Sequence, residues 1–502
     1  MIKQNLLELE IQGLSSDGRA VGRTKEGLAV FVQHALPGQR VLAHVTRLQK
    51  HFAEAQASVI LRRSAEERAA PCPHAGSCGG CPWQTLPYDA QLRWKRRIVL
   101  DAMIRIGRLN IKDSFIPLPL FAGKEAPLEW GYRNKMEFCF ARGEDGGTIL
   151  GLRERYSHRA FSVLHCRLQT ARTMKVLEEL RRQCEKHGLY AAPASMQENA
   201  SKKDRDHSIL RFAVVREPKG GGCMLELITL PAPATEGSIR QIGGEMMRSG
   251  SITGFVHSIR TAQTSVAYGE RAVFSLGEAT LSETLSIEGI PLDFRLGHAS
   301  FFQVNSQAAE LLYSTAVRLA SELFEKTLGR WGKSCWDIYC GVGGLALSMS
   351  RHFDHVYGLE TAEQAVRLAR QNACINGLDS SSFSFESGDA SLLESRFTNF
   401  GVPDLLVADP PRAGMDAEVT RALLKHQPQN LLLVSCNPAT LARDLARLAP
   451  AYSLRAVQPV DLFPQTPHVE TVVLLCRKHI DAEKQISVTI ETEDGWRADK
   501  SV

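Results

Sequence analysis

The stretch Trp336-Asp-Ile-Tyr-Cys-Gly-Val-Gly-Gly-Leu345 organises the C-terminal part of the chain. Its apolar start predicts a strand, its glycines predict a tight turn, and the residues that follow have helical spacing. Glycine lets the backbone approach a ligand closely and exposes amide donors where a helix begins. The next strand ends at Glu360, 19 residues after Gly341, where a carboxylate can accept both hydroxyls of a ribose. The stretch therefore predicts a nucleoside-binding turn.

Strands and helices alternate around this turn, from about residue 300 to residue 478. The apolar strands are expected at Cys335–Tyr339, His355–Leu359, Leu405–Ala408 and Leu431–Ser435. Such alternation implies an α/β fold with a doubly wound, largely parallel sheet of the Rossmann-like kind. Ligands of such sheets bind at the carboxyl ends of the strands, so side chains placed there are the functional candidates.

Three features favour S-adenosyl-L-methionine over a nicotinamide dinucleotide as the ligand. The turn reads Asp-x-x-x-Gly-x-Gly from Asp337, rather than Gly-x-Gly-x-x-Gly. The third strand is followed by Asp389, where a short acid could bond an adenine amino group. The fourth strand ends in Asp409-Pro-Pro-Arg412, whose prolines hold the chain extended and set the direction of Asp409.

A cysteine and a glutamate stand where a reaction at a pyrimidine ring would need them. The fifth strand runs into Ser435-Cys436-Asn437-Pro438 and a helix, so the helix dipole should lower the pKa of the Cys436 thiol. Carbon 5 of uracil is too weak a nucleophile to take a methyl group directly, and a thiolate must first add to carbon 6. A base must then remove the carbon 5 proton, and Glu470 is the candidate. A buried core cysteine and a salt-bridged surface glutamate are the alternatives.

The 502 residues are enough for about three domains. Residues 6–61 alternate apolar and polar side chains between glycine turns, which is typical of a small five-stranded barrel. We expect this barrel over residues 1–62, a central α+β domain with a cysteine cluster over 63–299, the methyltransferase domain over 300–478, and a polar tail over 479–502. A helix is expected at 89–108, and its run Arg93-Trp-Lys-Arg-Arg97 is expected to be solvated.

Composition excludes some classes of protein. The net charge of +5 is compatible with a polyanionic partner without requiring one. The sequence contains no uninterrupted apolar run of about 18 residues, so no membrane-spanning helix is expected. The N-terminus has no pattern of a secretory signal, so a cytoplasmic location without a membrane partner is expected. In that reducing compartment the 12 cysteines do not indicate a disulfide framework.

The segment Cys72-x5-Cys78-Gly-Gly-Cys81 places three thiols in one loop. A metal or an iron–sulfur cluster bound there would need a fourth soft ligand from elsewhere in the chain. Zinc is the alternative occupant, because four thiolates also suit a closed structural zinc site. The five-residue gap is looser than the spacing usual for zinc ribbons, and this favours the cluster.

Jointly, these motifs resemble one family, the RNA (uracil-5-)-methyltransferases, in the branch with an N-terminal TRAM domain and an iron–sulfur cluster. The resemblance extends over nearly the whole chain. The matching pieces are Phe302-Gln-Val-Asn305, the Asp337–Gly344 turn, Asp409–Arg412, Ser435–Pro438 and His468-Val-Glu470. It implies that Cys436 is the nucleophile and Glu470 the proton-abstracting base. Phe301-Phe302 adjoins the donor motif and could line the base pocket or pack in the core.

The resemblance also implies the cofactor contacts and the partners. Donor contacts are expected from Gln303, Tyr339, Gly344, Glu360, Asp389 and Asp409. Relatives often have Asn where Gly344 stands, so this position loses a side-chain contact. The fourth ligand of a 4Fe-4S cluster falls on Cys166, joining Cys72, Cys78 and Cys81.

The expected partner is RNA, 23S rRNA before tRNA, and the protein is expected to act as a monomer. A tRNA uridine-54 methyltransferase is the nearest alternative. An adenine N6-methyltransferase would need neither Cys436 nor Glu470, and a non-catalytic RNA-binding iron–sulfur protein would not need the donor motifs. Both are less favoured readings of the same residues.

Overall fold

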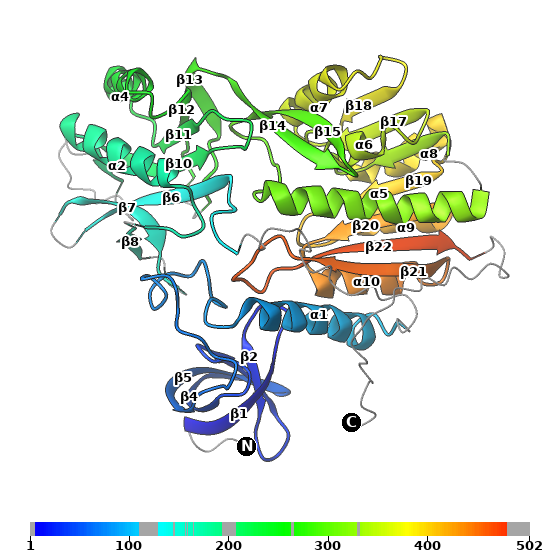
Figure 1. The fold of residues 1–502 in the computed structure, drawn as a ribbon, viewed down its shortest axis with the longest axis horizontal. Helices are drawn as coiled ribbons and strands as arrows, with labels where there is room; N and C mark the ends of the chain where they lie inside the picture. Colours follow the sequence, from blue (N-terminus) through cyan, green and yellow to red (C-terminus); the bar gives the residue numbers. More distant parts are fainter. Residues whose placement is uncertain are drawn as a thin grey trace.

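The computed structural model describes residues 6–109, 129–143, 146–155, 157, 159–163, 165–192, 207–262, 266–328 and 332–478. The tail expected over 479–502 lies outside the described residues. Four β structures follow one another along the chain: a small barrel, an eight-stranded central sheet, a two-stranded hairpin and a seven-stranded C-terminal sheet (Figure 1). None of the helices in the described ranges is long and apolar enough to cross a membrane.

The N-terminal part forms the five-stranded barrel expected from the sequence. Its strands are β1 (Leu6–Leu14), β2 (Ala20–Arg23), β3 (Ala29–Gln33), β4 (Arg40–Leu48) and β5 (Phe52–Arg62). They close in the order β1-β2-β3-β5-β4. Alternate residues such as Val30, Val32 and Val41 point inward and are fully buried. Closure pairs each strand on both sides, so no hydrogen-bonding edge of the barrel is left open.

Helix α1 (Tyr88–Arg105) lies between the barrel and the C-terminal sheet, where it packs on α10 (Pro438–Leu448) (Figure 1). The sequence suggested that its basic run is solvated, but the structure shows that one residue of this run is buried. The Lys95 ammonium is fully buried and lies 2.6 Å from a carboxylate oxygen of Asp461. A buried charge is stable only when it is paired, so this ion pair fixes α1 against the chain that precedes β22 (Glu470–Arg477).

The central sheet has eight strands, and α2 (Ala171–Lys186) and α4 (Glu236–Arg248) pack together beside it (Figure 1). Its strands are β6 (Lys135–Arg142), β7 (Thr148–Arg153), β8 (Ala160–Ser162), β9 (Tyr190–Ala191), β10 (Ser208–Arg216), β11 (Met224–Thr229), β12 (Gly254–Ile259) and β13 (Arg271–Gly277). The hairpin of β14 (Thr280–Ile287) and β15 (Ile290–Gly297) follows, and it packs on α5 (Ser306–Leu328) and α7 (Glu363–Ile375) of the C-terminal unit.

The C-terminal sheet has seven strands in the order β18-β17-β16-β19-β20-β22-β21. Besides β22 they are β16 (Ser334–Asp337), β17 (His355–Glu360), β18 (Phe383–Ser387), β19 (Leu405–Ala408), β20 (Asn430–Ser435) and β21 (Tyr452–Val460). The first five are parallel, whereas β22 runs antiparallel to both neighbours. The remaining helices are α6 (Gly344–Met349), α8 (Leu393–Phe400) and α9 (Ala417–His426). This is the expected doubly wound α/β fold.

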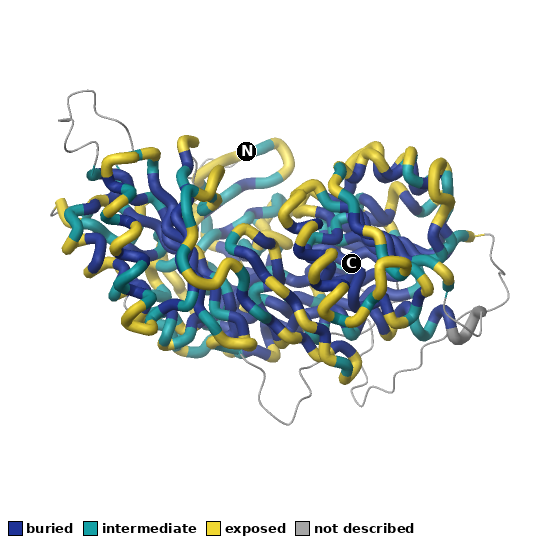
Figure 2. Tube along the Cα trace, turned by 90° about the horizontal axis from the view of Figure 1, so that it is seen from above, coloured by how far each residue is buried: buried dark blue, intermediate teal, exposed yellow. Residues whose placement is uncertain are grey.

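Burial explains why the strands of this sheet read as continuous apolar runs. All four residues of β19 and all six of β20 are buried, because helices cover both faces. The buried chain forms the interior of each sheet in Figure 2, and exposed residues gather on the outer turns. The carboxyl ends of the parallel strands are thereby held rigidly at one edge.

Candidate active site

A large cavity of about 1270 Å³ opens at the carboxyl edge of the C-terminal sheet. It extends from the glycine turn after β16 to the cysteine loop and to the barrel residues Asp17 and Gly18. Every residue that the sequence suggested for catalysis or donor binding lies on its wall: Gln303, Tyr339, Gly344, Glu360, Asp389, Asp409, Cys436 and Glu470. The fold therefore brings these eight positions to one place.

The glycine turn and Glu360 hold one another. Gly341 and Gly343 have φ angles of 54° and 95°, in the left-handed region that glycine adopts without strain. The Gly341 N–H donates to one carboxylate oxygen of Glu360 at 3.1 Å, and the Ala362 N–H donates to the other at 2.9 Å. This carboxylate is thus oriented at the end of β17 before any ligand arrives.

Asp389 is in a different environment, at the outer part of the cavity. Its side chain caps a short 3-10 turn by accepting from the Ser391 N–H at 2.8 Å. The hydrogen bonds from Ser391 hold the pKa of Asp389 below its ordinary value. It therefore remains an ionised hydrogen-bond acceptor.

Three buried carboxyl groups meet below the turn. Burial, reinforced by the neighbouring Asp409, raises the pKa of Asp337 to about 7. Burial also raises the pKa of Asp409 to about 7. Glu470 is buried beside Asp409, and its pKa lies well above the ordinary value for the same two reasons. Groups so close together do not all ionise readily, and a bound cation would favour their charged forms.

The Cys436 thiol differs from the sequence expectation. Burial and the neighbouring Glu470 raise its pKa to about 11, although Arg412 acts in the opposite direction. The prediction of a lowered pKa is therefore wrong for the protein without ligands. Loss of hydration and the nearby acid outweigh the dipole of α10. Arg412 is the nearby cation that favours the thiolate form.

The two loops that carry Arg412 and Cys436 are bonded together. The Asn437 side-chain amide donates to the Arg412 carbonyl at 3.2 Å, and the Thr440 hydroxyl donates to the same oxygen at 3.2 Å. The Asn437 amide oxygen also accepts from the Ala439 N–H at 3.1 Å, which caps α10. Asn437 and Thr440 therefore hold the guanidinium-bearing segment beside the thiol.

His468 contacts the same guanidinium. One guanidinium nitrogen of Arg412 lies 3.2 Å from Nδ1 of His468. Burial and the Arg412 charge lower the pKa of His468 to about 4. At neutral pH the imidazole is therefore uncharged, and it can accept a hydrogen bond from Arg412.

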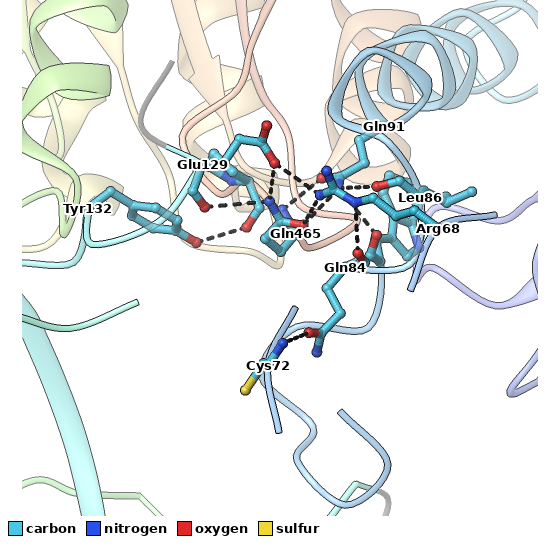
Figure 3. A network of polar contacts seen from close by, with 10 residues as sticks. Arg68, Cys72, Gln84, Leu86, Gln91, Glu129, Tyr132 and Gln465 are labelled. Carbon is cyan, nitrogen blue, oxygen red and sulfur yellow. Dashed lines mark hydrogen bonds and ion pairs between the residues drawn. The ribbon is translucent and has the colours of Figure 1, made fainter. Parts of the chain in front are cut away.

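The loop between β21 and β22, residues 461–469, approaches Glu470 and is held at Gln465 (Figure 3). Gln465 is fully buried and has a φ angle of 72°, which is uncommon outside glycine. Its N–H donates to the Gln91 side chain at 2.7 Å, and the Gln91 amide donates back at 2.9 Å. Its own amide donates to Glu129 at 3.1 Å. Partners from two distant segments thus define the backbone just before Glu470.

The same network reaches the cysteine loop. Figure 3 shows Arg68 between Gln465 and Gln84, with its Nε donating to the Gln84 carbonyl at 3.1 Å. The Gln84 side chain in turn accepts from the Cys72 N–H at 3.0 Å. A few hydrogen bonds therefore connect segments that are 397 residues apart in the sequence.

The four cysteines expected as ligands lie in one neighbourhood. The pKa of Cys81 is raised to about 12, first by burial and then by Cys166, Cys78 and Cys72. The Gly80 N–H donates to the Cys78 sulfur at 3.3 Å. In the positions that the described side chains adopt, no three His, Cys, Asp or Glu residues are close enough to hold a metal ion. The donor set fits a soft metal, but a formed metal site is not shown.

Sequence reasoning missed three residues of this site. Tyr313 of α5 lines the cavity, but an isolated tyrosine in an apolar helix gives no functional signal. Gln465 is polar and follows Pro464, which suggests only a turn. Arg412 was part of a recognised motif, but its place beside Cys436 follows from the fold alone.

Comparisons with known proteins agree with this geometry. Residues 263–478 match the tRNA (Uracil-5-)-methyltransferase family, and residues 6–58 match the TRAM domain. An RNA methyltransferase of Nitratidesulfovibrio vulgaris is 41% identical, with 96% of this chain and 98% of that protein covered. One of Listeria innocua is 34% identical, with 95% and 98% covered.

A solved structure is similar over most of the chain. The Pyrococcus abyssi tRNA (uracil-54, C5)-methyltransferase, in complex with S-adenosyl-L-homocysteine, has a TM-score of 0.68 and 25% identity. The match covers 93% of this chain and 100% of that one. With the donor turn, the barrel and the shared cavity in place, the chain belongs to the RNA (uracil-5-)-methyltransferase family and is an S-adenosylmethionine-dependent RNA methyltransferase with a TRAM domain.

Proposed function

We propose that this protein methylates carbon 5 of one uridine in a folded RNA through a covalent bond to Cys436. The observation that carries the proposal is the shared wall of one cavity. Cys436, Arg412, Asp409 and Glu470 lie there together with the glycine turn of the donor site. A thiol, a cation and buried acids are the groups that this reaction requires.

The reaction begins at the thiol. Arg412 favours the ionised form of Cys436, and the thiolate adds to carbon 6 of the uracil ring. The ring electrons then concentrate at carbon 5, with the O4 oxygen carrying negative charge. S-adenosylmethionine supplies the methyl group as a sulfonium when it is bound. Glu470 accepts the proton of carbon 5, the sulfur–carbon bond breaks, and the electron pair returns to the Cys436 sulfur.

The raised pKa of Glu470 suits the removal of the carbon 5 proton. Burial and Asp409 make its carboxylate a stronger base than an exposed glutamate. Because Cys436 lies inside the cavity, the target base must leave its stack to reach it. Phe301 borders the cavity and is 70% exposed, whereas Phe302 is buried in the core. Of the two aromatic residues, Phe301 is therefore the one available for stacking on RNA.

The test is adduct formation with RNA that contains 5-fluorouridine. Fluorine at carbon 5 blocks the final proton removal, so the covalent complex accumulates. The wild-type protein with S-adenosylmethionine should give a band that resists denaturing electrophoresis and has the summed mass in mass spectrometry. Cys436→Ala should give no band, whereas Cys374→Ala, which removes an exposed thiol, should give the same band. An adduct retained by Cys436→Ala would exclude the proposed nucleophile.

We further propose 23S rRNA as the substrate, before tRNA. The support is the resemblance to the branch that combines the barrel with the cysteine loop. The similarity to a tRNA (uracil-54, C5)-methyltransferase supports tRNA as the second candidate. Mapping 5-methyluridine in both RNAs of a deletion strain, with and without the restored gene, distinguishes the two. Loss of the modified nucleoside from tRNA alone would contradict the first choice.

The finer proposal for the cysteine loop is a 4Fe-4S cluster held by Cys72, Cys78, Cys81 and Cys166. Two observations support it. The other three thiols raise the pKa of Cys81, which places the four cysteines near one another, and the Gly80 N–H donates a hydrogen bond to the Cys78 sulfur. Anaerobically purified protein should contain about four iron and four sulfide per chain and absorb visible light. If the protein instead contained one zinc per chain and no sulfide, the cluster proposal would be wrong and the zinc site would be supported.

A further inference from the structure

Tyr313 occupies the space beside the last glycine of the donor turn. A Cβ atom added to Gly344 would lie 2.6 Å from the Tyr313 hydroxyl oxygen, closer than Cβ atoms approach non-bonded atoms in proteins. The tyrosine is 5% exposed, and it lines the cavity. No hydrogen bond within the described part of the chain engages this hydroxyl. A hydroxyl on the wall of a cavity that makes no hydrogen bond to the protein is available to a ligand.

The sheet topology indicates which end of the donor Tyr313 meets. Glu360 ends β17 and Asp389 follows β18, so the ribose and the adenine belong on that side of the turn. Tyr313 instead interacts electrostatically with Asp409 after β19 and Asp337 of β16, and less with Glu470. It therefore lies on the opposite side of the turn, where the amino-acid end of the donor extends.

We propose that the Tyr313 hydroxyl donates a hydrogen bond to the carboxylate of bound S-adenosylmethionine and so positions the donor. This inference rests on the donor binding that the family membership establishes. Tyr313 takes over the space that a side chain at position 344 would fill, and Gly344 is required for it.

The chemistry of the neighbours supports this assignment. The amino-acid end of the donor carries an ammonium and a carboxylate. The acids Asp337 and Asp409 suit the ammonium, but they cannot attract the carboxylate. Burial and these acids raise the pKa of Tyr313 far above its ordinary value, so its hydroxyl stays protonated and can donate. A hydrogen bond to a charged group is the stronger kind.

The test compares two ligands on the folded protein without RNA. S-adenosylhomocysteine has the carboxylate, and its decarboxylated analogue lacks it. Each is measured by competition against radiolabelled S-adenosylmethionine, up to millimolar concentration. Tyr313→Phe should weaken the binding of S-adenosylhomocysteine about tenfold and change the affinity for the analogue less than twofold. In turnover, the KM for S-adenosylmethionine should rise more than kcat falls.

Tyr452→Phe is the matched control. Its hydroxyl is also buried but donates to the carbonyl of Pro428 at 3.1 Å, away from the cavity. It should leave both affinities unchanged. Equal weakening of both ligands by Tyr313→Phe, or none, would overturn the proposal. Failure of the wild-type protein to bind S-adenosylhomocysteine would instead contradict donor binding itself, and an adduct missing with 5-fluorouridine would concern Cys436 alone.

Discussion

The strand ends of the C-terminal sheet and the loop before β22 place reactive groups in the same cavity by different means. Asp337 ends a parallel strand, and Asp409 and Cys436 each directly follow one. A local bond from the Ala439 N–H to the Asn437 side chain completes the turn after Cys436. Glu470 instead depends on the 461–469 loop, which is held by α1 and by the segment around Glu129. One half of the site is local, and the other half is assembled from the whole chain.

This difference has a consequence for how the site can fail. Loss of a group at a strand end removes a chemical function but leaves the rigid sheet edge intact. Loss of a contact at Gln465 leaves every reactive group present but releases the backbone that positions Glu470. A misplaced base is expected to slow the reaction less than an absent one.

The largest effect is expected from Glu470→Gln. The amide has the shape of the acid but cannot accept the carbon 5 proton, so kcat should fall by about 10²–10⁴. Because addition and methyl transfer come earlier, a covalent complex with ordinary uridine RNA should accumulate. Radiolabelled methyl transfer and denaturing electrophoresis measure the two quantities.

Glu283→Gln is the control for that variant. Glu283 is another fully buried glutamate whose pKa burial raises, and it accepts a hydrogen bond from Ser306. Its kcat should stay within about threefold of wild type. A Glu470→Gln protein that turns over normally would show that another group removes the proton.

A smaller effect is expected from Gln465→Ala, which tests the loop. Loss of its hydrogen bonds to Gln91 and Glu129 should lower the free energy of unfolding by about 1–3 kcal/mol. If the loop positions Glu470, kcat at saturating substrates should also fall about tenfold. Urea unfolding and steady-state kinetics check both.

Gln39→Ala separates positioning from stability. Gln39 is equally buried and hydrogen-bonded to Glu67, but it belongs to the barrel. It should lose a similar free energy of unfolding without a change in kcat. Equal kcat losses in the two variants would mean that the Gln465 network only stabilises the fold.

The smallest effect concerns the strand-end group Cys436. Because its pKa is raised to about 11, the thiolate fraction should increase about tenfold per pH unit up to pH 10. Alkylation by iodoacetamide should follow this slope, with the exposed Cys374 as internal standard. Arg412→Gln removes a charge that favours the thiolate, so the pKa rises further and alkylation at pH 8 slows about three- to tenfold. A plateau below pH 9 would instead indicate a lowered pKa.

Much of this protein could be inferred from local patterns. The barrel, the parallel sheet and the positions of the glycine turn, Asp409 and Cys436 all follow from short stretches, because a buried strand and its turn are encoded by adjacent residues. The carboxyl edge of a parallel sheet then brings such stretches together without further information. This is why six of the eight candidate residues reach one cavity, whereas Gln303 and Glu470 come from segments outside the parallel strand ends.

The tertiary structure alone decided the electrostatics and the long-range contacts. The Cys436 pKa depends on burial and on Glu470, and no reading of its neighbours in sequence reveals either. Lys95 looks like a surface residue until Asp461 is found beside it. Tyr313 lies 31 residues before Gly344 in the chain, and its hydroxyl fills the space above that glycine only after α5 packs on α6. Desolvation and pairing are properties of a packed environment, and sequence order does not contain them.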